Sequence, residues 1–239
     1  MTKQNCLNKS FKIVPMVVCS LIAMAEVGSA RYSCPEGMAQ STVYFVPHIK
    51  DYCSSATPCA KFKRQVRMQG SGTLPGNKLL TYTGKTVDLG SCETAFGASG
   101  NCLIPYISVA ADPRFYSMGD IIDMPALKGK VMTLPNGKTF VHPGYFIVQD
   151  TGGAIKGKGR FDFFTGSLSM KDPKNTFGAK GDPELPFLDK DACTNTKRFT
   201  VVRRSSFSYQ QKLLAIEDAL RGSSSSPKVM VASVFGGAK

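Results

Sequence analysis

The sequence predicts a mainly β protein, a small barrel of many short strands with one helix near the C-terminus. Strong helix formers are sparse, whereas Thr, Phe and Val, which favour strands, and Gly, which favours turns, are plentiful. Short alternating or apolar segments recur between turns rich in Gly, Pro and Asn. Many short strands with a single helix favour a small barrel over an open parallel sheet.

The expected strands are separated by clear turn signals. Gly70-Ser71-Gly72 forces one turn, and Pro135-Asn136-Gly137 forms the turn of a hairpin. A buried strand at residues 145–149 leads into a glycine-rich stretch, after which alternation resumes. The other expected strands occupy residues 42–47, 62–68, 78–83, 104–111, 120–124, 130–134, 138–141, 198–203 and 228–235.

The helix is expected at residues 207–220. Its apolar residues recur at helical spacing, and Gly222 followed by a run of serines ends it. The sequence contains no internal repeat and no coiled-coil pattern. The apolar residues of this helix are Leu213, Leu214, Ile216 and Leu220.

Residues 1–30 are predicted to be a signal peptide. Lysines precede an apolar run at residues 13–25. Small residues form two candidate cleavage sites, Ala23-Met24-Ala25 at the end of the run and Gly28-Ser29-Ala30 after it. The run is short for a membrane span, so we expect no stable span after leader cleavage. The alternatives are an uncleaved anchor and, less favoured, a lipoprotein. The mature chain, residues 31–239, is expected in the periplasm or secreted, with association with the outer membrane as an alternative. It is expected to form one domain with a cysteine-rich N-terminal extension.

The cysteines are consistent with export. Six of the eight lie outside the leader, which predicts three disulfides in an oxidising compartment, with fifteen possible pairings. Cys53 with Cys59 and Cys92 with Cys102 are the easiest local pairs. A zinc site is the alternative, but the cysteine spacings are unsuitable and the chain has only two histidines. We therefore expect no metal and no cofactor.

The mature chain is strongly basic. The formal charge is +13, and +11 remains without the three lysines and one glutamate of the leader. A basic exported protein is suited to an anionic polymer. No nucleic-acid recognition motif is present, so anionic envelope polymers fit better than nucleic acid. The alternative is that the charge only keeps the protein soluble.

Two aspartates are candidates for chemistry. Asp150 ends a buried strand, and Asp162 lies between two phenylalanines on the next strand. A carboxyl group flanked by aromatic residues is partly desolvated, which raises its pKa and suits it to donate a proton. The structural alternatives are that Asp150 caps the glycine turn and that Asp162 pairs with Arg160. No serine-nucleophile elbow, phosphate-binding loop or marked histidine offers a competing site.

One stretch resembles a known family. It reads Asp150-Thr151-Gly152-Gly153-Ala154-Ile155-Lys156-Gly157, followed by Arg160-Phe161-Asp162-Phe163-Phe164. This resembles the signature of three-aspartate (3D) domains, which include the catalytic barrel of the membrane-bound lytic transglycosylase A family. Residues 109–114 resemble the segment with the first aspartate, and residues 66–72 and 81–84 resemble further segments of that family. The resemblance implies a six-stranded double-psi β-barrel, here with extra strands and one C-terminal helix.

The resemblance also implies an activity and its residues. Members cleave the MurNAc-GlcNAc bond of peptidoglycan glycan strands and form a 1,6-anhydro sugar, with one aspartate as acid and base. By motif position that residue is Asp162, and Asp150 and Asp112 match the two other aspartates. The implied substrate-binding residues are Gly152, Gly153, Lys156, Arg160, Thr83 and Gln69.

The chain departs from the family in two places. Phe115-Tyr116-Ser117-Met118-Gly119 follows Asp112 where the family has an Ile-Pro-Leu-Gly-like run. The segment between Gly84 and Val109 is shorter than in the family, which predicts a shorter or missing groove between two domains.

Two other functions are the alternatives: a non-catalytic, expansin-like wall-binding module, and a glycoside hydrolase that uses water and a second carboxylate.

Overall fold

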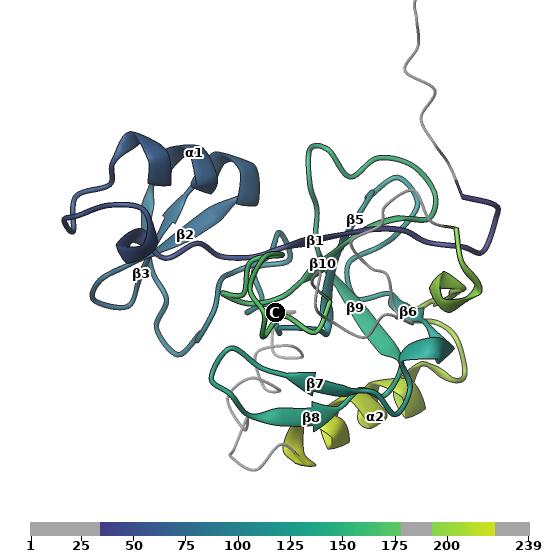
Figure 1. The fold of residues 1–239 in the computed structure, drawn as a ribbon. Helices are drawn as coiled ribbons and strands as arrows, with labels where there is room; N and C mark the ends of the chain where they lie inside the picture. The colour runs from purple at the N-terminus through teal and green to yellow at the C-terminus, as the bar shows by residue number, and fades with distance from the viewer. Residues whose placement is uncertain (1–33, 178–192, 223–239) are drawn as a thin grey trace, which may run out of the picture. The chain divides into compact units, whose positions relative to one another are not determined.

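The structure is a computed structural model that describes residues 34–177 and 193–222. Six strands form one sheet in the order β1-β10-β5-β9-β6-β11, and the central ones lie side by side in Figure 1. β1 pairs with β10 and β5 pairs with β9 in parallel, whereas the other neighbours are antiparallel. The six strands are β1 (Gln40–Tyr44), β5 (Ser108–Ala111), β6 (Ile121–Asp123), β9 (Tyr145–Asp150), β10 (Arg160–Phe164) and β11 (Thr200–Val202).

One face of this sheet packs against a large hydrophobic core. Alternate residues of a strand point to the same face, so β1, β5 and β10 each contribute every second residue. These residues are Val43, Val109, Ala111, Phe161 and Phe163. A β7–β8 hairpin and helix α2 also contribute to the core, and α2 packs against β8 and β6. Their bounds are Val131–Thr133, Thr139–Val141 and Tyr209–Gly222.

The opposite face of the sheet carries a second cluster. Tyr44, Ala110 and Phe164 lie on this face and pack with apolar residues of the segment between residues 79 and 103. The polar residues Thr42, Asp150 and Asp162 on this face are only partly buried, and the candidate site described below contains them.

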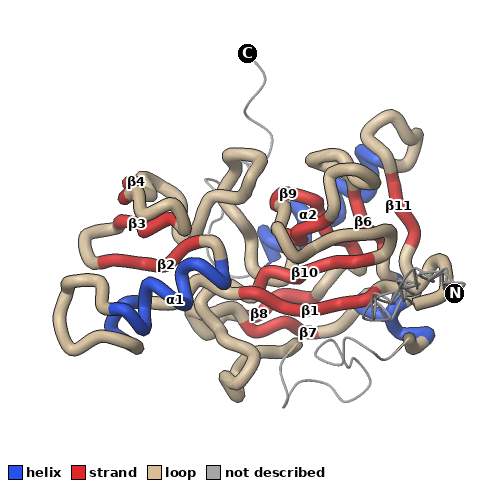
Figure 2. Tube along the Cα trace, turned by 90° about the horizontal axis from the view of Figure 1, so that it is seen from above, coloured by secondary structure: helices blue, strands red, loops and turns tan. Residues whose placement is uncertain are grey.

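A smaller sheet with its own helix precedes β5 in the chain. Figure 2 shows α1 alongside β2, β3 and β4. Ile49, Phe62, Val66 and Leu80 form its compact core. The elements are α1 (Ala60–Gln69), β2 (Ser71–Leu74), β3 (Lys78–Thr81) and β4 (Thr86–Asp88), with 3-10 turns at Ile49–Asp51, Pro125–Leu127 and Asn195–Lys197 elsewhere in the chain.

The prediction of a strand at residues 62–68 is wrong, because this segment is helix α1. Phe62 and Val66 are four residues apart and lie on one face of the helix, where they are buried. The intervening Lys, Arg and Gln residues are good helix formers. Over so short a run, this pattern of basic and apolar residues is compatible with both a helix and a strand, so tertiary packing decided which one forms.

Most of the other predicted strands are confirmed within a few residues of their expected bounds. The strand expected at 104–111 begins only at Ser108, because the chain turns at Pro105 and Tyr106. The φ angle of Tyr106 is 63°. Strand β4 was not predicted from the sequence. The predicted helix is confirmed as α2. The leader and the strand expected at 228–235 lie outside the described residues.

The prediction of a mainly β fold with a C-terminal helix is confirmed, but the pairing among the described strands gives an open sheet. β1 and β11 are its edges. The segments just before them approach each other through a single antiparallel bridge between Met38 and Arg198. Hydrogen bonds from Ala39 N to Lys197 O (2.8 Å) and from Phe199 N to Gly37 O (2.9 Å) accompany this bridge.

Three disulfides join cysteines of the described residues, in agreement with the number predicted for the mature chain. Both local pairs, Cys53–Cys59 and Cys92–Cys102, are confirmed. Cys34 pairs with Cys193, 159 positions further along the chain. Among the described residues, no helix is both long and apolar enough to cross a bilayer.

Replacing Gly72 in β2 with alanine should destabilise the small sheet. A Cβ at this position would lie 2.7 Å from atoms of both Phe62 and Val66. Overpacking of this kind costs about 1–3 kcal/mol, so Gly72→Ala should lower the free energy of unfolding in urea by that amount. Ser71→Ala, on the same strand, is the control and should stay within about 0.5 kcal/mol of wild type. Equal stability of the two variants would contradict the close packing of α1 on β2.

Candidate active site

Two of the predicted aspartates lie in one row across the sheet. Asp162 of β10 is paired with Ala110 of β5, and Ala110 is paired with Asp150 of β9. On the other side of Asp162, its partner in β1 is Thr42. Strands are about 4.8 Å apart, so the Cα atoms of the two aspartates are about 10 Å apart. The row therefore places both carboxyl groups on the same face.

A β-bulge brings Asp150 into this row. Val109 pairs with Val148, but the next residue, Ala110, pairs with Asp150, so Gln149 is the extra residue. The Gln149 side chain is buried and accepts a short hydrogen bond from Ser108 Oγ. With regular pairing Gln149 would oppose Ala110. Bulges of this kind redirect side chains next to functional sites.

Asp162 is the least constrained of the three aspartates. Within the described residues, its one hydrogen-bond donor is Thr42, whose Oγ1 lies 2.7 Å from Oδ1. Burial raises the pKa of Asp162 to about 6, although the hydroxyl of Thr42 and the charge of Arg160 act in the opposite direction. The expected proximity of Arg160 is thus present, but no direct ion pair forms, since Arg160 Nη1 donates to Gln40 O instead (3.2 Å). Asp162 can therefore hold a proton near neutral pH.

Asp150 is held by three donors. Tyr44 Oη donates to one carboxylate oxygen (3.0 Å), and the backbone N–H groups of Ala98 and Thr151 donate to the other (2.9 Å each). Burial raises the pKa of Asp150, while these three hydrogen bonds oppose the rise. The bond to Thr151 agrees with the expected turn-capping role. Both carboxylate oxygens accept hydrogen bonds, which fixes the orientation of the Asp150 side chain.

Asp112 anchors the glycine-rich loop between β9 and β10. Its side chain is shielded from solvent and accepts from Arg114 Nη2 (2.6 Å) and from the backbone N–H of Gly157 (2.8 Å). The hydrogen bonds from Arg114 and Gly157 hold the pKa of Asp112 well below its usual range. Gly157 has a φ of 104°, a conformation that favours glycine. Asp112 thus stabilises the conformation of the glycine-rich loop at Gly157.

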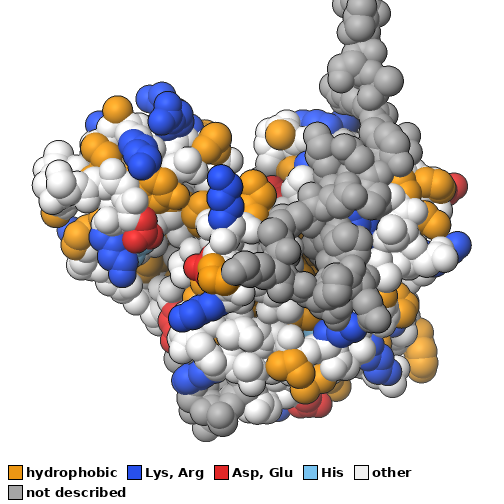
Figure 3. Space-filling view, in the orientation of Figure 1, with side chains coloured by type: hydrophobic (Ala, Val, Ile, Leu, Met, Phe, Trp, Pro, Cys, Tyr) orange, Lys and Arg blue, Asp and Glu red, His pale blue; other side chains and the backbone are white. Residues whose placement is uncertain are grey.

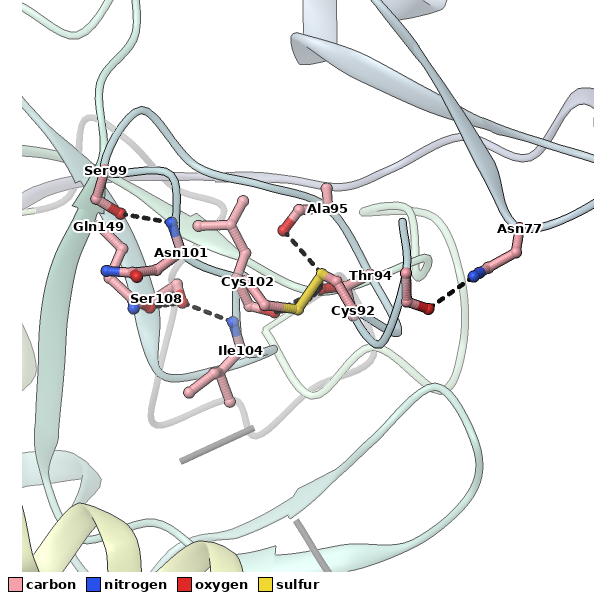
Figure 4. The surroundings of a disulfide bond; sticks show 12 residues. Asn77, Cys92, Thr94, Ala95, Ser99, Asn101, Cys102, Ile104, Ser108 and Gln149 are labelled. Carbon is pink, nitrogen blue, oxygen red and sulfur yellow. Dashed lines mark hydrogen bonds between the residues drawn. A yellow bond between two sulfur atoms is a disulfide. The ribbon is translucent and has the colours of Figure 1, made fainter. Parts of the chain in front are cut away.

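A disulfide-linked loop supplies the Ala98 N–H that binds Asp150. Figure 4 shows Cys92 joined to Cys102. In the same loop, Asn101 N donates a hydrogen bond to Ser99 Oγ close to Gln149. Gly97 of this loop packs so closely on the bulge that an added Cβ would lie 2.3 Å from Gln149 O. The disulfide, the loop and the bulge therefore position Asp150 together.

The predicted substrate-binding residues fall into two groups. Four belong to or adjoin the glycine-rich loop, where Gly153 and Lys156 are exposed and Gly152 and Arg160 are partly buried. The other two lie in the small sheet and its helix. Gln69, at the end of α1, accepts a hydrogen bond from Phe45 N (3.1 Å), and the exposed Thr83 shares one with Thr81. Gln69 is thus tied to the end of β1, whereas no described contact joins Thr83 to the aspartates.

Sequence reasoning missed Thr42 and Tyr44. Both lie on β1, which pairs in parallel with β10, so they align with Asp162 and Phe164. Their polar groups contact Asp162 and Asp150 across 120 and 106 positions of sequence. A strand was predicted at residues 42–47, but nothing in the sequence predicted which strand it would pair with. Among the described residues no group of three or more His, Cys, Asp or Glu could hold a metal ion.

Comparison with known proteins supports the resemblance. Residues 107–181 match the family model of the 3D domain, a region that includes all three aspartates, and the resemblance expected from the sequence is confirmed there. Two solved structures of MltA from Escherichia coli are similar to parts of this chain, one of them described as revealing a unique lytic transglycosylase fold. The first is 27% identical over 34% of this chain and 23% of its own, with a TM-score of 0.22. The second is 24% identical over 38% and 25%, with a TM-score of 0.25.

The aligned region thus spans about a quarter of the length of either MltA chain. No curated protein matches the chain.

Asp162→Asn should stabilise the protein at neutral pH. The unfolded carboxyl group ionises near pH 3.8 and the folded one near 6. Because the folded state binds the proton more tightly, wild type loses stability as the pH rises from about 4 to 6. Asparagine does not titrate, so the variant should be more stable above pH 6 by up to about 3 kcal/mol. Urea unfolding between pH 4 and 8 measures the difference, and a constant offset would contradict the raised pKa.

Asp112→Asn is the contrasting variant. The folded pKa of Asp112 is lowered, so its contribution to stability is present above pH 4 and is lost as the pH falls below that. The variant should be less stable than wild type at pH 7 and lose this deficit in acid. A gain in stability at pH 7 would show that the carboxylate does not hold Gly157 and Arg114.

Proposed function

We propose that this protein is an exported peptidoglycan lytic transglycosylase that cleaves the MurNAc-GlcNAc bond and leaves a 1,6-anhydro end, with Asp162 as its single acid and base. The observation that carries the proposal is the state of Asp162 in a segment that matches the 3D domain. This carboxyl group has a pKa raised to about 6, and within the described chain only Thr42 donates to it. It can give up a proton and later take one back.

The reaction needs one group in two protonation states. Protonated Asp162 donates to the glycosidic oxygen as the C1–O bond breaks and GlcNAc leaves with a hydroxyl group. The C6 hydroxyl of MurNAc then attacks C1, and its proton passes to the ionised Asp162, which restores the starting state. No water is consumed. General acid–base help of this kind contributes about 10²–10⁴-fold to the rate.

The other two aspartates support Asp162. Asp150 adds negative charge on the far side of Ala110, which contributes to the raised pKa of Asp162. Asp112 fixes the glycine-rich loop through Gly157. We assign substrate binding to Gly152, Gly153, Lys156 and Arg160 around that loop, and to Gln69 and Thr83 in the small sheet and its helix.

The hydrogen bonds of Asp150 favour this scheme over hydrolysis by water. A water-using glycosidase needs a second carboxylate that is free to act as base or nucleophile. Both oxygens of Asp150 accept hydrogen bonds within the protein, and Asp112 is bound to Arg114. The substrate's own hydroxyl group as nucleophile removes the need for a second reactive carboxylate.

The fold and location belong to the same proposal. We propose that the six-stranded sheet is a double-psi β-barrel whose edges approach at Met38 and Arg198. Three disulfides are typical of a protein that acts in an oxidising compartment, which supports export to the periplasm or beyond.

Mass spectrometry of purified peptidoglycan sacculi after incubation with the protein tests the activity. We expect anhydro-muropeptides from wild type and from the control Asp218→Asn, an exposed aspartate on α2. Asp162→Asn should lower their release by at least about 100-fold while it still sediments with sacculi. Products with reducing ends would identify a water-using hydrolase. Binding by wild type without any release would identify a wall-binding module, and both results would overturn the proposal.

The pH dependence gives a second test. Asp162 must be protonated at the start, so kcat/KM should fall about tenfold per pH unit above a midpoint near 6. Thr42→Val removes a donor to the ionised carboxylate, which should move this midpoint to higher pH. Thr86→Val, an exposed change on β4, should leave it in place. A profile that is flat from pH 5 to 8 would exclude Asp162 as the group that titrates.

A further inference from the structure

Helix α1 carries an unusual concentration of positive charge. Four of its ten residues, Lys61, Lys63, Arg64 and Arg67, are basic and exposed, and none of its residues is acidic. At 100° per residue the four cover the arc opposite the buried Phe62 and Val66. Figure 3 shows lysine and arginine side chains gathered over α1.

These charges work against the helix that carries them. Lys61 and Arg64, Arg64 and Arg67, and Lys63 and Arg67 are three or four residues apart, where like charges are neighbours and repel. Lys61 and Lys63 also lie in the first turn, the end of a helix that favours negative charge. Within the described residues none of the four pairs with a carboxylate, and Lys61 only lies 5.7 Å from the ring centre of Tyr52.

Tertiary packing maintains the helix despite this repulsion. Phe62 and Val66 are buried with Ile49 and Leu80, and the Cys53–Cys59 disulfide ends at the residue that precedes α1. A local arrangement that opposes its own element and is held by its surroundings is typical of a functional surface. A bound anionic partner would remove the repulsion.

The position of α1 relates it to the candidate active site. Gln69, its last residue, binds Phe45 N at the end of β1. The same strand supplies Thr42 to Asp162 and Tyr44 to Asp150. From Phe45 back to Thr42 is about 10 Å of extended chain. A polymer bound at Asp162 would therefore bring neighbouring groups close to α1.

We infer that the exposed face of α1 binds the carboxylates of the peptide side chains of peptidoglycan and so holds the wall beside Asp162. This inference rests on the proposed function. Peptide carboxylates are spread along the glycan and suit a row of separate positive charges. A membrane surface fits less well, because Met68 is the one large apolar side chain exposed on α1. Nucleic acid fits less well because this face has no aromatic residue for base stacking.

Sedimentation with purified sacculi tests the inference, with all proteins carrying Asp162→Asn so that nothing is cut. The test variant has Lys61→Gln, Lys63→Gln, Arg64→Gln and Arg67→Gln. The matched control has Lys128→Gln, Lys138→Gln, Lys171→Gln and Lys174→Gln, four exposed lysines outside α1 with the same total change of charge. Glutamine is a good helix former, so the test variant should unfold at the same temperature as its parent or higher.

At low salt we expect the α1 variant to bind sacculi on the order of tenfold more weakly than its parent. Its binding should depend less on salt, and the control should bind almost as well as the parent. Sacculi whose carboxylates have been amidated with carbodiimide and methylamine should bind the parent as weakly as intact sacculi bind the variant. Equal loss in variant and control, or undiminished binding to amidated sacculi, would overturn the inference.

Vesicles that contain phosphatidylglycerol distinguish a lipid partner. If the parent bound these vesicles as tightly as sacculi, and the α1 variant lost both, the face would serve anionic surfaces in general and the peptide assignment would be wrong. The binding assay needs no turnover, so its outcome is separate from that of the activity test. A protein that releases no anhydro-muropeptides could still bind through α1, and an active one could fail to do so.

Discussion

The candidate site depends on one irregularity of the sheet, the bulge at Gln149 between β5 and β9. The extra residue places Asp150, rather than Gln149, opposite Ala110 and therefore in line with Asp162. The buried side chain of Gln149 is held by Ser108, and its backbone oxygen leaves no room for a side chain at Gly97. Because the bulge is packed on two sides, the arrangement of the two carboxyl groups is built into the core.

Three aspartates on one domain have three different environments. Asp112 is paired with the side chain of Arg114, accepts from two backbone N–H groups and stays ionised. Asp150 is partly buried, and three donors share its two oxygens. Asp162 is partly buried beside a single hydroxyl group, and its pKa is raised to about 6. Hydrogen bonds from the charged Arg114 side chain and from backbone N–H groups lower the pKa of Asp112, whereas at Asp150 and Asp162 burial outweighs the hydrogen bonds and raises the pKa.

Helix α1 and Asp162 share a physical feature, since each holds an arrangement that is unfavourable for its own stability. Asp162 is a carboxyl group placed where its ionised form is disfavoured. Helix α1 carries four like charges without acidic partners among the described residues. The phenylalanines on either side of Asp162 and the core beneath α1 maintain them. Such local conflicts, held by well-packed surroundings, are expected where a protein binds or reacts.

The sequence by itself determined the β class, most strand positions, the helix at the C-terminus and the two local disulfides. These depend on local periodicity, turn residues and short spacings, which can be read along the chain. The three aspartates were proposed as site residues because their segments resemble the 3D-domain signature. Only the tertiary structure decided that residues 60–69 form a helix, because the spacing of the two buried residues, Phe62 and Val66, fits both a helix and a strand. It also decided that Thr42 and Tyr44 of β1 contact the aspartates, and that the bulge selects Asp150 over Gln149. Parallel pairing joins residues more than 100 positions apart, and no local pattern encodes which strand becomes the neighbour.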